Sequence, residues 1–148
     1  MKLSGTATLP ARREQVWELL NDPKRLAKCL PGAQSLEPDG PDRYRVAMKF
    51  GIAAFSGNFQ GSLALAEKNP PESVKMLVEG RGAPGFMKGE GTIALHGKGS
   101  ETTVSYDGEA HVGGVIASVG QRMIEAAAKK IVAQFFDSAA QELRAHSA

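Results

Sequence analysis

The sequence predicts an α+β fold in which a curved antiparallel sheet of seven strands wraps around one long C-terminal helix. Two patterns support this prediction. Across residues 33–112, apolar and polar residues alternate with a period of two, as in strands with one covered face and one face in water. Across residues 116–143, apolar residues recur at helical spacing along a stripe broad enough to lie on a sheet.

Length and composition favour one domain, residues 1–148, with a core large enough to need no disulfide. Cys29 is the single cysteine, and the three histidines are too scattered to form a Cys/His metal site. The 18 basic and 16 acidic residues are nearly balanced, which argues against nucleic acid as a partner. No run approaches the roughly twenty apolar residues of a membrane span, and the chain opens on a strand pattern, not a signal peptide. We therefore expect a cytoplasmic protein that meets a membrane only from its surface.

The first strand is predicted at residues 2–9, where apolar or small residues alternate with polar ones. Residues 11–20 have apolar side chains at helical spacing and predict a short helix. Asp22 and Pro23 are typical of an N-cap followed by proline at the first helical position, which predicts a second short helix over residues 23–30.

A meander of six further strands follows, separated by turns rich in glycine, proline and asparagine or aspartate. The predicted strands are residues 33–36, 43–50, 58–65, 74–79, 87–96 and 102–112. Glycines recur on the face that should point toward the helix, where they permit the sheet to bend and leave space above it. These glycines are Gly5, Gly61, Gly89, Gly91 and Gly108. We expect a cavity there; the alternative is that the glycines only allow curvature and side chains fill the space.

Large residues of the sheet and of the first turns of the helix, residues 115–123, are expected to line this cavity or its mouth. The assigned residues are Phe50, Phe55, Phe59, Met76, Phe86, Met87, Ile116, Val119 and Met123, with Tyr44 and Tyr106 as polar members. The rest of the helix, including Phe135 and Phe136, is expected to be ordinary core.

Three glycine-rich segments should lie at one end of the sheet, because alternate turns of an antiparallel meander share an end. They are residues 51–57, 80–85 and 113–114. The first two contain apolar residues flanked by basic ones, which predicts contact with an anionic membrane or a partner protein. The residues assigned to this contact are Lys49, Ile52, Phe55, Arg81, Phe86 and Lys88. The alternative is that the apolar side chains fold inward and close the end of the cavity.

The faces of the predicted strands argue against catalysis. The acidic residues and histidines of the last two strands fall on the water-facing side, so no carboxylate or imidazole is expected in the cavity. Tyr44, Thr102 and Tyr106 are the polar residues on the inner side, and such groups commonly hydrogen-bond locally or orient a ligand carbonyl. Cys29 lies in an apolar helix end and is expected to be buried and structural. The GxGxxG match at residues 80–85 precedes a strand rather than a helix, so it predicts a hairpin loop and not a dinucleotide site.

Four segments of the chain carry a family resemblance. They are VWELLNDPKRLAKCLPGAQSLE (residues 16–37), FSGNFQGSLAL (55–65), GEGTIALHGKGSETTVSYDGEAHVGG (89–114) and IASVGQRMIEAAAKKIVAQFF (116–136). In these segments, which together span nearly the whole chain, the sequence resembles the CoxG family. This family is named for a small accessory protein encoded with molybdenum-containing carbon monoxide dehydrogenases, and it belongs to the START/Bet v 1-like (SRPBCC) superfamily.

The resemblance implies a helix-grip fold and a protein that helps a molybdenum hydroxylase-type enzyme complex meet the inner face of the cytoplasmic membrane. It also implies a cavity that holds a quinone or another apolar small molecule, with no covalent cofactor. We therefore expect a non-catalytic ligand-binding accessory protein.

Two alternatives remain open. A small polyketide cyclase, hydrolase or dehydratase could use the same cavity, as some relatives with this fold do, with Tyr44 and Tyr106 as candidate acids. A membrane adaptor with a filled core would need no ligand. Polar, water-filled clusters in the cavity would favour chemistry, whereas an unbroken apolar lining would favour carriage.

Overall fold

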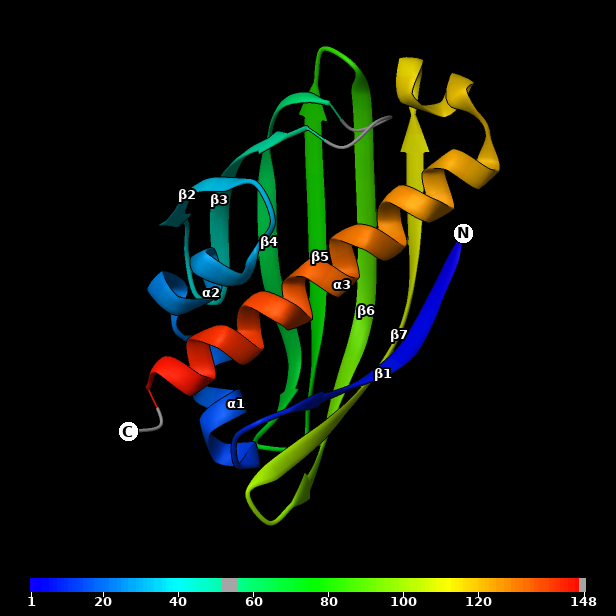
Figure 1. Cartoon of the computed structure of the whole chain (residues 1–148). Helices are drawn as coiled ribbons and strands as arrows, with labels where there is room; N and C mark the ends of the chain where they lie inside the picture. Colours follow the sequence, from blue (N-terminus) through cyan, green and yellow to red (C-terminus); the bar gives the residue numbers. More distant parts are fainter. Residues whose placement is uncertain (52–55, 147–148) are drawn as a thin grey trace.

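A computed structural model describes residues 1–51 and 56–146 of the chain. A curved antiparallel sheet of seven strands has the order β1-β7-β6-β5-β4-β3-β2, and a long helix crosses its inner face diagonally (Figure 1). The strands are β1 (Lys2–Leu9), β2 (Ala33–Pro38), β3 (Arg43–Phe50), β4 (Gly57–Asn69), β5 (Ser73–Gly82), β6 (Gly85–Lys98) and β7 (Glu101–Gly113). The helices are α1 (Arg13–Asn21), α2 (Pro23–Cys29), the 3-10 segment η2 (Gly114–Val119) and α3 (Gln121–Ala145). This is the α+β helix-grip arrangement expected from the sequence.

The predicted strand phases are confirmed by the burial of the side chains. Buried residues alternate with more exposed ones along β3 and β6, because helices cover one face of the sheet and water covers the other. The buried apolar residues of the sheet are Leu9, Tyr44, Val46, Met48, Phe50, Phe59, Leu63, Leu65, Val74, Ile93, Leu95 and Val104. β1 pairs with β7, so the first strand of the chain lies beside the last.

Local hydrogen bonds fix the segment between β1 and β2. The Asp22 side chain accepts hydrogen bonds from the backbone N–H groups of Lys24, at 3.1 Å, and Arg25, at 3.5 Å, which confirms the predicted cap of α2. The Thr102 hydroxyl is fully buried and donates to the Ala11 carbonyl at 2.7 Å. Thr102 therefore ties β7 to the start of α1, and its inward position has a structural cause.

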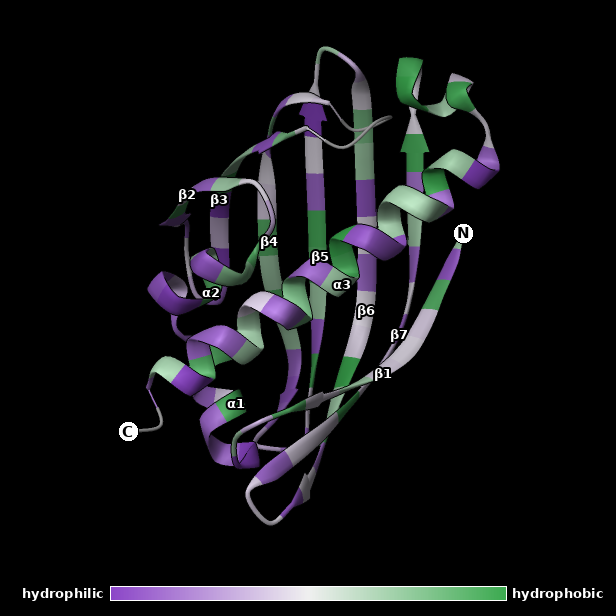
Figure 2. Ribbon diagram, in the orientation of Figure 1, coloured by the Kyte–Doolittle hydropathy of each residue, from purple (hydrophilic) through white to green (hydrophobic). Residues whose placement is uncertain are grey.

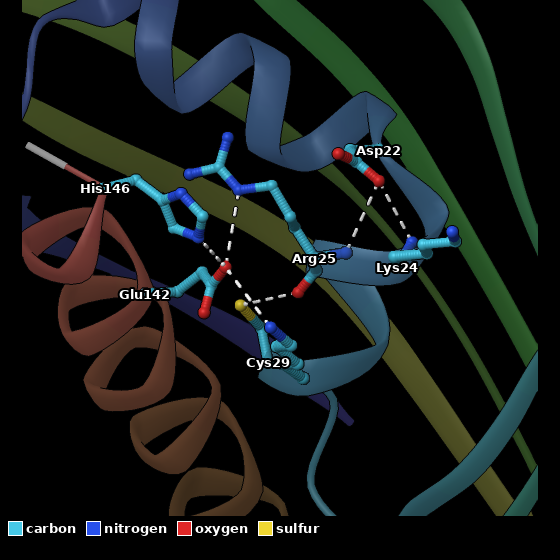
Figure 3. Close-up of polar contacts among 7 residues, drawn as sticks. Asp22, Lys24, Arg25, Cys29, Glu142 and His146 are labelled. Atoms are coloured by element: carbon cyan, nitrogen blue, oxygen red, sulfur yellow. Dashed lines mark hydrogen bonds and ion pairs between the residues drawn. The ribbon is translucent and has the colours of Figure 1, made fainter.

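The end of α3 is held against α2 by a cluster of charges around Glu142 (Figure 3). One carboxylate oxygen, Oε1, lies 3.4 Å from Arg25 Nε and 3.9 Å from Lys28 Nζ. The same oxygen lies 2.9 Å from Nε2 of His146, one turn further along the chain. The Glu142 side chain is only 10% exposed, so these contacts lie in a partly dehydrated setting.

The C-terminal segment is not one continuous helix, which corrects the expectation for residues 116–143. Residues Gly114–Val119 form the 3-10 segment η2, and α3 begins only at Gln121. Gly120 separates the two with φ +100° and ψ 153°, a backbone conformation that glycine adopts and helices do not. In the sequence, Gly120 fits the helical row of small residues, so the apolar period alone hides the break.

Candidate ligand-binding cavity

A cavity of about 290 Å³ lies between the sheet and α3. Its wall on the sheet side includes Leu3, Met48, Phe50, Met76, Val78, Met87, Ile93, Tyr106 and Val112. Its wall on the helix side consists of Ala128, Ile131, Val132, Phe135 and Phe136. Leu30 and Pro31, just after α2, and Met1 complete the apolar lining. The expected cavity is therefore present, with an almost entirely apolar wall.

Glycines on the inner face of the sheet help to leave this space open. Gly89, Gly91 and Gly108 all border the cavity, as the sequence pattern predicted. At Gly89 the nearest atom to an added Cβ would be the backbone oxygen of Glu109, 3.7 Å away. A side chain at this position would project into open space, so its absence contributes directly to the volume of the cavity.

Charged side chains of the two strands that form the wall lie on the other face of the sheet. Lys88, Glu90, Asp107, Glu109 and His111 belong to the stretches that border the cavity, yet each is exposed and alternates with an inner-face residue. Because successive side chains of a strand point to opposite faces, these charges point away from the cavity. The predicted outward phase of the carboxylates and histidine in these stretches of β6 and β7 is therefore confirmed.

The two tyrosines assigned to the site are separated by the sheet order. Tyr106 on β7 borders the cavity, and its ring stacks on Phe136 of α3 with centroids 5.3 Å apart. Tyr44 lies on β3, is buried, and is not part of the cavity wall. A reaction that needs both tyrosines at one ligand therefore has no matching geometry here.

Several other residues assigned to the site also lie elsewhere. Of the assigned set, Phe50, Met76, Met87 and Tyr106 border the cavity. Phe59 is buried in the core and meets the Phe50 ring edge to face, with centroids 5.8 Å apart. Ile116 is buried outside the cavity wall, whereas Phe86, Val119 and Met123 are exposed at one end of the molecule. Ile52 and Phe55 lie outside the described residues.

The helix contributes its middle rather than its first turns to the cavity. Residues 115–123 were expected to line the entrance, and Phe135 and Phe136 to be core; instead, both phenylalanines border the cavity. The break at Gly120 explains this difference, because the helix that crosses the sheet begins five residues later than the apolar period suggests. The inner-face glycines were the available signal, since the helical residues above them are those that line the space.

Exposed apolar side chains gather at the end of the sheet where β5 meets β6 and β7 ends, around η2 (Figure 2). We name Phe86, Val115, Val119 and Met123 the tip patch; their exposed fractions are 42%, 70%, 43% and 48%. The backbone N–H of Ile116 donates to the carbonyl of Pro84 at 2.8 Å, which holds η2 beside the β5–β6 turn. The expected convergence of these turns is therefore confirmed.

Basic residues adjoin the tip patch. The guanidinium of Arg81 lies 5.8 Å from the centroid of the Phe86 ring, within the range of a cation–π contact. Lys88 is exposed and forms an ion pair of 3.6 Å with Glu79, and Lys49 is exposed near the end of β3. This end of the molecule thus combines an apolar surface with several cations.

Cys29 is buried, as expected, and is not activated as a nucleophile. Burial, followed by the nearby Glu142 carboxylate, raises the pKa of its thiol from 9.0 to about 11. The thiol donates a hydrogen bond to the Arg25 carbonyl at 3.4 Å. Nowhere in residues 1–51 and 56–146 do three or more His, Cys, Asp or Glu side chains group in a way that could hold a metal ion.

No helix in the described part of the chain has the length and apolar character needed to cross a membrane.

Solved structures share this architecture. A conserved protein from Geobacillus kaustophilus is 36% identical, with a TM-score of 0.93 over 97% of this chain and 95% of that one. A START superfamily protein from Mycobacterium smegmatis is 14% identical, with a TM-score of 0.76 over 97% of both chains. The Zhui aromatase/cyclase from a Streptomyces species is 16% identical, with a TM-score of 0.68 over 97% of this chain and 93% of that one. The last two likenesses establish the fold alone.

Sequence comparison identifies the family. A search of curated proteins found no significant match. The model of the carbon monoxide dehydrogenase CoxG family matches residues 5–144, which is most of the chain. Together with the helix-grip fold and its apolar cavity, this match shows that the chain belongs to the CoxG family.

Proposed function

We propose that this protein binds an apolar ligand of the quinone type in the cavity and serves as a non-catalytic accessory protein of a molybdenum hydroxylase-type enzyme complex. The observation that supports this most strongly is the apolar lining of the cavity between the sheet and α3. An enclosed apolar space gains free energy when it receives an apolar molecule from water, at about 25 cal/mol for each Å² of apolar surface removed from solvent.

The proposed partner rests on the family. CoxG is named as a subunit of carbon monoxide dehydrogenase, so an oxidoreductase complex of that type is the natural recipient of the ligand. A quinone-type ligand fits such a partner, since quinones accept electrons and partition into membranes. The protein would then work at the cytoplasmic membrane, on its inner face, without spanning it.

Carriage is favoured over a cyclase or hydrolase reaction. General acid–base chemistry needs titratable groups at the reacting atoms, and the charged residues of β6 and β7 point away from the cavity. Tyr106 is the polar residue that the inner face supplies to the cavity wall, and Tyr44 is remote from it. An apolar space with one phenol favours retention of a ligand over its transformation.

A titration tests the ligand claim. Menadione, a short quinone without a prenyl tail, is added to the purified protein and its heat of binding is recorded. We expect saturable binding at one site with a negative heat-capacity change, because apolar surface is buried. If menadione and longer-chain quinones all fail to bind, the proposed ligand class is wrong.

The tip patch is the proposed contact with the membrane. Val115 and Val119 are exposed apolar residues of η2, and Arg81 lies beside Phe86 to meet anionic lipid head groups. We expect the Val115→Asp/Val119→Asp variant to lose most of its flotation with vesicles of mixed phosphatidylcholine and phosphatidylglycerol. Ser100→Asp, which adds a carboxylate in the exposed β6–β7 turn, is the control and should float as the wild type does. Equal flotation of the double variant and the wild type would contradict this assignment.

A further inference from the structure

Tyr106 lies at the boundary between two spaces of different character. One is the apolar cavity described above, and the other is a groove between β1 and α3. Both spaces share the walls Leu3, Tyr106, Val132 and Phe136. The groove is more polar, because Lys2, Ser4, Thr6, Lys129 and Asp137 border it. Moreover, β1 is an edge strand, so half of its backbone N–H and C=O groups point away from β7.

The position of the Tyr106 ring is set by two neighbours. Gly5 is the residue directly opposite Tyr106 on β1, and an added Cβ at Gly5 would lie 2.6 Å from the Tyr106 hydroxyl oxygen. The ring therefore reaches across β1 only because position 5 is glycine. From the helix side, Phe136 stacks on the ring at 5.3 Å, and Phe135 supports Phe136 edge to face, with centroids also 5.3 Å apart.

The Tyr106 hydroxyl has no hydrogen-bond partner within the described residues, and the side chain is only partly buried. A phenol at an otherwise apolar wall usually has a partner when it is desolvated, because an unpaired polar group costs free energy. A ligand that enters the cavity would cover this hydroxyl. The ligand would therefore have to supply an oxygen or nitrogen at this point for the hydroxyl to remain paired.

Building on the proposed function, we propose that Tyr106 fixes the orientation of the ligand by a hydrogen bond to the oxygen-bearing end of a quinone-type head group. The ring oxygen lies at the boundary with the polar groove, and the apolar remainder lies against Ile131, Met87 and their neighbours. Gly5 is a positioning residue, because it admits the tyrosine ring to the place where the hydroxyl meets the ligand.

A phenol suits a carrier of both redox forms of such a ligand. Its O–H donates to the carbonyl oxygen of a quinone, and its oxygen accepts from the hydroxyl of the corresponding quinol. A lysine or arginine at this place could only donate, and an ionised carboxylate could only accept. Tyr106 thus allows the oxidised and the reduced forms to be held in the same orientation.

The test compares menadione with dimethylnaphthalene, a hydrocarbon of similar shape that has no oxygen. Titrations are run on wild type, Tyr106→Phe and, as a matched control, Tyr44→Phe, which removes a buried hydroxyl away from the cavity. We expect Tyr106→Phe to weaken menadione binding about threefold to tenfold, the effect of one neutral hydrogen bond, and to leave dimethylnaphthalene binding unchanged. Tyr44→Phe should change neither affinity.

Infrared spectra of isotope-labelled menadione give a second, structural readout. In wild type, one carbonyl stretching band should shift to lower frequency because that carbonyl accepts a hydrogen bond, and Tyr106→Phe should abolish the shift. Gly5→Ala keeps the hydroxyl but displaces it, so it should also reduce the shift.

The outcomes separate the two proposals. If wild type binds menadione and Tyr106→Phe binds it equally well with an unchanged carbonyl band, the role of Tyr106 is overturned while the ligand class stands. If wild type binds neither probe, the proposed function itself fails.

Discussion

At the scale of single residues, Glu142 links the end of α3 to the helix that precedes β2. Its carboxylate lies near Arg25, Lys28 and His146, and its side chain is largely shielded from water. Shielding matters because a charge pair exposed to water contributes little, whereas a partly buried charge that loses its partner is costly. The α2–α3 contact also supports the cavity, since Leu30 and Pro31 follow α2 directly and form part of its wall.

Replacement of Glu142 by glutamine should lower the free energy of unfolding by about 1 to 3 kcal/mol, the range for hydrogen bonds that involve charged groups. The physical cause is the Arg25 guanidinium, which remains partly buried without a counter-charge. Urea unfolding followed by circular dichroism measures the change.

Glu37→Gln is the matched control for this measurement. Glu37 pairs with Arg45 at 3.6 Å, but both side chains are about two-thirds exposed. The control should change stability by less than about 0.5 kcal/mol. A Glu142 variant no less stable than this control would show that the cluster does not hold the helices together.

Cys29 gives a prediction for alkaline pH. The pKa of its thiol is about 11 in the folded protein, above its ordinary value of 9.0, so the unfolded chain loses the proton first as pH rises. The folded state then binds more protons than the unfolded state, and the free energy of unfolding must fall between these two pH values. Cys29→Ala should show a smaller fall across this window than wild type in urea titrations at each pH. Identical slopes would mean that the thiol is not shielded as the structure indicates.

At the scale of elements, Gly120 decides where the C-terminal helix begins. Its φ of +100° lies in a region that other residues rarely adopt, and no atom lies within 4 Å of where a Cβ would be. The cost of a side chain there would therefore come from the backbone and not from a clash. Gly120 also separates η2, which bears two residues of the tip patch, from the helix that covers the cavity.

We expect Gly120→Ala to lower the free energy of unfolding by about 1 to 3 kcal/mol, the cost of a strained backbone conformation. Gly89→Ala is the comparison, because Gly89 has an ordinary backbone conformation and open space around it. It should leave stability nearly unchanged in the same urea experiment. Equal stability of the two variants would contradict the proposed role of Gly120 as a conformational break.

At the scale of the whole molecule, the sheet was predictable from the sequence and the position of the helix on it was not. A period of two fixes which face each strand residue points to, so Phe50, Met76 and Met87 were correctly assigned to the cavity side. That period carries no information about where along the sheet the helix passes. Tyr44 and Tyr106 share a face for this reason, yet only Tyr106 lies under the helix segment that borders the cavity.

The residues of α3 were assigned less well for a related reason. A helical period identifies an apolar stripe, but the part of that stripe above the glycines depends on where the helix starts and at what angle it crosses. Both follow from the turn at Gly120 and from the contacts of α2 with the far end of α3. Such contacts are long-range in the sequence, and no local pattern encodes them.

The most direct test of the central claim is a quinone titration of two tryptophan variants on the same helix. Ile131 borders the cavity, so Ile131→Trp should fill it and weaken menadione binding at least about tenfold. Met123 lies two turns earlier and is 48% exposed outside the cavity, so Met123→Trp should bind as wild type does. Equal binding by both variants, or a loss confined to Met123→Trp, would contradict a ligand site between the sheet and the middle of α3.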